Sequence, residues 1–88
     1  MSALHTLDVR LFEALAGTCL SATERDRVVD LCESAVAMAP ELGLPHPGQA
    51  ARCAVHLLVG NAVPGLDPRV RSDLARLCEV AVVRGLPD

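Results

Sequence analysis

The sequence has no lysine, tryptophan or tyrosine, and Phe12 is its only aromatic residue. Without large aromatic rings, the core has to be filled by small aliphatic side chains, which here are mostly alanine, valine and leucine. All eight basic residues are arginines. The lack of lysine beside an abundance of alanine, arginine, glycine and proline is typical of a GC-rich bacterial genome, and it carries no information about function.

An excess of positive charge is also lacking, because the acidic residues outnumber the basic ones and the net charge is −3. Proteins that bind nucleic acid without sequence preference need a positive surface to neutralise phosphates, so this charge argues against such a partner. No stretch reaches the roughly 18–20 consecutive apolar residues that span a bilayer. The first residues also lack the basic and apolar regions of a signal peptide, and we expect no association with a membrane.

The four cysteines are irregularly spaced, and no CxxC pair occurs among Cys19, Cys32, Cys53 and Cys78. Disulfide frameworks belong to exported proteins, and no export signal precedes these residues. The sequence therefore predicts reduced thiols and a cytoplasmic protein. It predicts no cofactor.

Aliphatic residues recur at helical spacing through most of the chain, and 51% of the residues are hydrophobic, with a mean hydropathy of +0.35. Leucines at positions 4, 7, 11 and 15 predict a first helix that ends at Gly17, with Val9 and Phe12 beside them. Ser21 and Glu24 have the spacing of a capping box, which predicts a second helix from Ser21 to about Ala39. Its predicted buried residues are Val28, Leu31, Cys32, Ala35 and Met38.

The second half of the chain contains two further predicted helices. Gln49 to Ala62 is so apolar that only Arg52 and His56 are polar between Ala50 and Val59. A helix that is apolar nearly all round has to be surrounded by other elements, so we expect it to be the central helix of the fold. Asp67 followed by Pro68 predicts the start of the last helix, which runs to about Arg84.

These elements predict an all-α fold: a small up-down bundle of four main helices in a single domain, residues 1–88. The proline-rich connector is expected to keep one helical turn at Pro40–Leu42. A chain of this length buries only about 60–65% of its unfolded surface, yet this one is rich in apolar residues. The surplus predicts a homodimer.

The second half also resembles the first. Leu31–Val36 reappears as Leu77–Val82, an offset of 46 residues (78 − 32), and residues 4–42 share ten identities with residues 50–88. The pattern predicts a duplicated helical hairpin. The alternative is that helices built from so few residue types resemble one another by chance.

Two pairs of residues are candidates for chemistry. Cys53 and His56 have a spacing that presents sulfur and imidazole to one metal ion, although a core cysteine beside a hydrogen-bonded histidine is the simpler interpretation. Cys32 and Cys78 occupy equivalent positions of the repeat, so a two-fold bundle could bring them together as a redox pair. Matched core positions of the repeat are the simpler interpretation.

Residues 35–58 resemble a bacterial helix-turn-helix through a loose Ala-x-x-x-Gly-Leu pattern. Pro40–Pro45 would be the turn, and the following helix, which contains Arg52, would be the recognition helix. Pro40 interrupts the first helix of that motif, and Pro47 and Gly48 stand where residues should face bases. No phosphate-binding loop or catalytic motif occurs. The sequence therefore favours a small non-enzymatic interaction module, with an unidentified protein partner, that self-associates through an aliphatic helix face. A DNA-binding regulator and a thiol or metal sensor are the alternatives.

Overall fold

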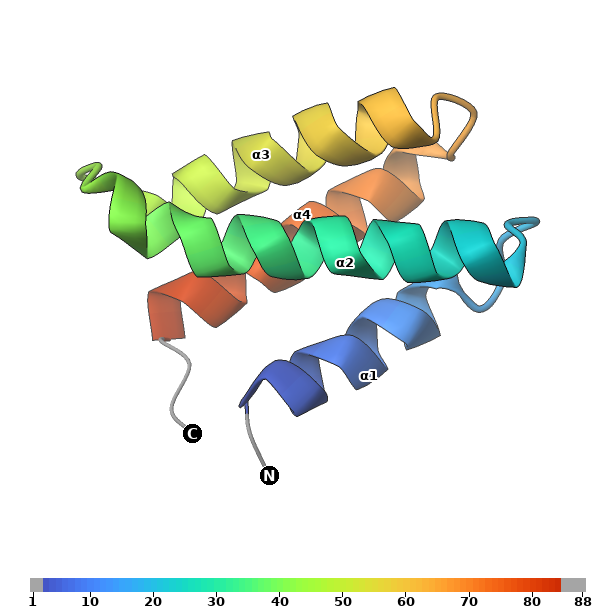
Figure 1. Ribbon diagram of the computed structural model, residues 1–88, viewed down its shortest axis with the longest axis horizontal. Coiled ribbons are helices and arrows are strands. Elements are labelled where there is room, and N and C mark those ends of the chain that lie inside the picture. The colour runs from blue at the N-terminus through green and yellow to red at the C-terminus, as the bar shows by residue number, and fades with distance from the viewer. Residues whose placement is uncertain (1–2, 85–88) are drawn as a thin grey trace.

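The computed structural model describes the backbone of residues 3–84 and the side chains of residues 7–84. Figure 1 shows four α-helices, each antiparallel to the one before it, so the predicted all-α up-down bundle is confirmed. The helices are α1 (Ala3–Leu15), α2 (Ala22–Met38), α3 (Pro47–Ala62) and α4 (Pro68–Arg84), and one turn of 3-10 helix, η1 (Ala39–Leu42), follows α2. No strand occurs among residues 3–84.

The helix ends follow the signals in the sequence. Ser21 Oγ accepts a hydrogen bond from the Glu24 N–H at 3.1 Å, and the Glu24 carboxylate accepts one from the Ser21 N–H at 3.0 Å, so the capping box is confirmed. Asp67 Oδ1 accepts from the Arg69 N–H at 2.9 Å and begins α4 as expected. The start of α3 lies at Pro47, two residues before the expected Gln49, because the fixed φ of proline suits the first position of a helix.

The middle of the bundle is the contact between α2 and α4. The Cys78 thiol donates a hydrogen bond of 3.8 Å to the backbone carbonyl of Cys32, and both cysteines are fully buried. Alanines Ala35 and Ala75 are buried on the same two helices, and such small side chains let the backbones approach closely. Helices α1 and α3 lie on opposite sides of this pair, and each packs against both α2 and α4 (Figure 1).

The core consists almost entirely of leucine and valine from all four helices. Its fully buried larger side chains are Leu11, Leu15, Val28, Val36, Val55, Val59 and Leu74. Burial of each such side chain contributes about 1.5–3 kcal/mol relative to leaving it exposed. The positions follow one stripe of each helix, as a 3.6-residue period requires.

The expectation that the stretch around Gln49–Ala62 is the central, enclosed helix is wrong. In α3 only Gly48, Ala51, Val55 and Val59 are buried, while Leu57 is 67% exposed. The reason is that α3 lies outside the α2–α4 pair, so only one stripe of it can meet a neighbour. Although α3 is apolar, no described helix combines the length and hydropathy needed to cross a membrane.

Three other burial assignments are also wrong. Val9 and Phe12 on α1 and Met38 on α2 are exposed, since each lies to the side of the stripe that its helix turns inward. Val29, Val36 and Ala75 are buried instead. An apolar residue at an outward position of a small bundle finds no second layer to cover it.

The predicted offset of 46 residues fits the comparison of α2 with α4 better than the comparison of α1 with α3. The bounds of α2 and α4 match at this offset, and the buried Val28, Val29 and Cys32 match the buried Leu74, Ala75 and Cys78. In contrast, the buried Leu7 and Leu11 match Cys53 and Leu57, which are exposed. The buried stripes of α1 and α3 thus lie two residues out of register with that offset.

Substitution Ser21→Ala removes the acceptor of the capping box and should lower the free energy of unfolding by about 1 kcal/mol. Ser34→Ala is the control, because Ser34 is an exposed serine inside α2. Urea unfolding followed by circular dichroism measures both. Equal stability of the two variants would contradict the role of the cap.

Gly43 ends η1 with a φ of +67°, a conformation that costs an L side chain about 1–2 kcal/mol. Gly43→Ala should therefore lower the melting temperature. Gly65 lies in another turn, where no positive φ occurs and an added Cβ meets nothing within 4 Å. Gly65→Ala should leave the melting temperature unchanged or raise it, and a fall as large as that of Gly43→Ala would remove the argument from backbone conformation.

Candidate functional site

A hollow of about 620 Å³ lies between the first half of α3 and the last turns of α4. Its polar lining comes from six residues, and the rest is proline, glycine and valine. The polar residues are His46, Gln49, Arg52, Cys53, His56 and Glu79. At Gly48 helices α3 and α4 are in direct contact. A Cβ added to this glycine would lie only 2.6 Å from Val83 Cγ2. Glycine at this position lets α3 and α4 come together there.

Cys53 and His56, the candidate metal ligands, both line this hollow. Cys53 is exposed and His56 is half-buried, so the interpretation of Cys53 as a core residue is wrong. Glu79 faces Arg52, with 3.9 Å between Oε1 and Nη1. No group of three or more metal-ligating side chains occurs within the described part of one chain.

Cys32 and Cys78, the candidate redox pair, meet at the centre of the bundle as the repeat predicted. A hydrogen bond with Cys78, burial, and unfavourable charge interactions with Cys78 and Glu33 all raise the pKa of Cys32 far above its usual value. A buried thiol that keeps its proton is a poor nucleophile, because the thiolate is the reactive form. In this conformation the pair is a packing contact, and neither cysteine is part of a disulfide.

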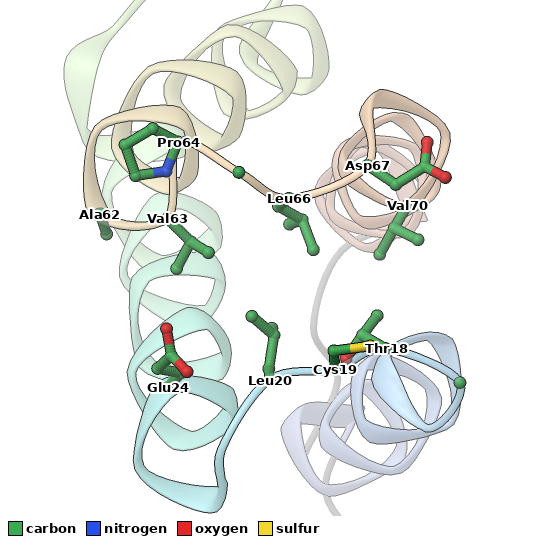
Figure 2. Close-up of a pocket in the computed structure, with 12 residues that line it drawn as sticks. Thr18, Cys19, Leu20, Glu24, Ala62, Val63, Pro64, Leu66, Asp67 and Val70 are labelled. Atoms are coloured by element: carbon green, nitrogen blue, oxygen red, sulfur yellow. The ribbon is translucent and has the colours of Figure 1, made fainter.

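A second hollow, of about 560 Å³, separates the α1–α2 connector from the α3–α4 connector. Figure 2 shows Leu20 and Leu66 pointing toward each other across it, with Glu24 and Asp67 at its edges. The two carboxylates already accept hydrogen bonds from backbone N–H groups at the starts of α2 and α4. A ligand in this hollow would therefore contact mainly the two leucine side chains and would find few free polar atoms to bind.

A pair of carboxylates, Asp8 on α1 and Glu33 on α2, lies where these two helices meet. Burial, a hydrogen bond with Asp8, and the charges of Asp8 and Asp30 raise the pKa of Glu33 to about 7. Asp8 Oδ1 is buried and accepts no hydrogen bond from a protein donor. The two residues lie on separate helices, so no spacing along one helix connects them and the sequence alone does not reveal the pair.

In the segment that resembles a helix-turn-helix, the first turn of α3 packs against α4. Gly48 is buried there beside Val83 and Glu79, and Arg52 faces Glu79. A recognition helix needs its first residues free to contact base edges. The residues at those positions in this chain are occupied by contacts within the bundle.

No protein-family model matches the chain, and no curated protein or solved structure resembles it closely enough to establish a relationship.

The Asp8–Glu33 pair predicts an unusual dependence of stability on pH. The folded state holds the Glu33 proton more tightly than the unfolded state, whose pKa is about 4.5. The stabilisation is therefore fully present below about pH 4.5 and is lost as the pH rises through about 7. Glu33→Gln should remove this slope and raise the free energy of unfolding at pH 8 by about 1 kcal/mol, since partial solvation screens the charges.

Urea unfolding of both proteins between pH 4 and 8 measures this effect. Glu13→Gln is the matched control, because Glu13 is an exposed glutamate on α1. If the wild type and Glu33→Gln have parallel stability curves, the two carboxyl groups do not share a proton.

Proposed function

We propose that the chain is a small non-enzymatic interaction module that self-associates through the outward face of α3. The observation that carries this proposal is the 67% exposure of Leu57 in the middle of that helix. Leu58 is exposed to 37% beside it, and Cys53 lies one turn before Leu57. Apolar side chains gathered on one exposed face mark interaction sites more often than scattered ones do.

The charge of the α3 face suits a second copy of the same chain. Arg52 is the only charged residue of α3, and it lies 3.9 Å from Glu79 of its own chain. Two α3 helices can therefore pack around a two-fold axis without bringing like charges together, which would be costly at an isologous interface. On α1, in contrast, the exposed residues include Arg10 and Glu13.

The surface available is large enough for a dimer. A standard interface buries about 800 Å² on each partner, which is about 15% of the 5495 Å² surface of this chain. Further apolar surface lies next to α3, because η1 packs against α3 and contains the exposed Leu42, and the exposed Leu44 follows in the connector. Small neighbours such as Ala50 and Cys53 leave room for Leu57 of the partner subunit.

In the cell, the dimer would serve as an accessory subunit that presents its helices to a further protein. Free thiols at all four cysteines support a reducing, cytoplasmic location, and the residue composition supports a bacterial source. The matched bounds of α2 and α4 support an origin by duplication of a helical hairpin. No observation favours DNA binding over this function.

The test is the oligomeric state at micromolar concentration. We expect light scattering to give about twice the monomer mass of 9.3 kDa for the wild type. Leu57→Glu should give the monomer mass, because it places a charge at the centre of the interface. Val9→Glu is the matched control, since Val9 is an exposed valine on the opposite side of the bundle, and it should leave the dimer intact.

A wild-type protein that is monomeric at this concentration would overturn the proposal. So would a dimer that Val9→Glu dissociates and Leu57→Glu does not. Circular dichroism of each variant establishes that it is folded.

A further inference from the structure

The exposure of Cys53 changes what the Cys53–His56 pair can do. The two residues are three apart on α3, so they lie on neighbouring positions of one helix surface, and both line the hollow beside α4. Cys53 is open to solvent and His56 is half-buried. A thiol and an imidazole in this arrangement are accessible to an ion from outside.

Sulfur and imidazole nitrogen together are the ligands that Zn²⁺ prefers, and a closed zinc site takes four of them in a tetrahedron. One chain supplies two. The nearby Glu79 carboxylate faces Arg52 at 3.9 Å, and no three ligating side chains lie together among the described residues. The site is therefore incomplete within a single chain.

A second copy of the chain would complete it. The apolar face proposed for self-association passes along Leu57, which is one turn from Cys53 and adjacent to His56 in sequence. A two-fold axis that runs through this part of α3 brings the pair on one chain close to the same pair on the other. Because α3 carries no acidic residue, no carboxylate of that helix competes with the thiol and the imidazole for the ion.

We propose that two copies of the chain bind one Zn²⁺ ion between their α3 helices, through Cys53 and His56 of one copy together with the partner's Cys53 and the partner's His56. The inference rests on the face proposed above for self-association. Each Cys53 thiol releases its proton to solvent as the zinc–sulfur bond forms, and each neutral imidazole binds through one ring nitrogen. Two protons leave for each ion bound, and nothing is oxidised or reduced.

The experiment is a titration of the purified full chain with Zn²⁺ under reducing conditions, followed by calorimetry and analytical ultracentrifugation. We expect one ion for every two chains and a dimer dissociation constant lowered about tenfold or more. With Co²⁺ in place of Zn²⁺, a sulfur-to-metal charge-transfer band and the visible bands of a tetrahedral ion should appear.

Cys53→Ser and His56→Ala should each abolish the metal-dependent dimer. Cys19→Ser is the matched control, because Cys19 is also an exposed free cysteine but lies at the other end of the bundle, and it should behave as the wild type. All three positions are at least partly exposed, so the variants should fold, and circular dichroism checks this.

Three results would overturn the inference. The first is no binding of Zn²⁺ or Co²⁺ at micromolar concentration. The second is one ion per monomeric chain, lost on His46→Ala, which would make His46 a third ligand within one chain. The third is a Cys19→Ser variant that loses the metal while Cys53→Ser retains it.

The outcome is separable from that of the proposed self-association. A metal-free dimer that Zn²⁺ does not tighten would retain the proposed function and exclude the zinc site. A metal-free monomer that dimerises only with Zn²⁺ would retain the zinc site and exclude self-association of the metal-free chain.

Discussion

The close approach of α2 and α4 is the constraint on which the rest of the fold depends. At its centre the Cys78 thiol donates a hydrogen bond of 3.8 Å to the backbone carbonyl of Cys32. Both cysteines are fully buried, and Ala35 and Ala75 are buried on the same two helices. Two helices this close leave no room for a third between them, so α1 and α3 pack on opposite sides of the pair (Figure 1).

This arrangement gives the two outer helices one buried stripe each and leaves the remainder of each helix facing outward. The two outward faces differ in chemistry. Arg10 and Glu13 on α1 are charged and exposed beside the exposed Val9 and Phe12, whereas the exposed face of α3 contains Leu57 and no acidic residue. An exposed apolar side chain on an outer helix can be covered only by another molecule. The proposed self-association and the proposed zinc site both rest on the absence of acidic residues from α3 and the exposure of Leu57.

The interface of α1 with α2 has a different character, because it includes the carboxyl groups of Asp8 and Glu33. A proton shared by such a pair removes the repulsion between two charges at a partly buried contact. Since the pKa of Glu33 is about 7, this contact is sensitive to pH in the range where most carboxylates are fully ionised. The contact between α1 and α2 should therefore weaken as the pH rises through about 7.

Local chemistry in the sequence determined the helices and their ends. Ser21 with Glu24, Asp67 with Pro68, and the break at Pro40 act on backbone groups a few residues away, so the printed sequence contains everything that they need. Tertiary structure alone decided which stripe of α3 is buried. An almost uniformly apolar helix has no polar face to mark its outside, and its rotation depends on the shape of the surface that α2 and α4 offer it. For the same reason the pairing of Asp8 with Glu33 and the exposure of Cys53 could not be predicted, because each depends on how two separate helices are rotated and placed against one another.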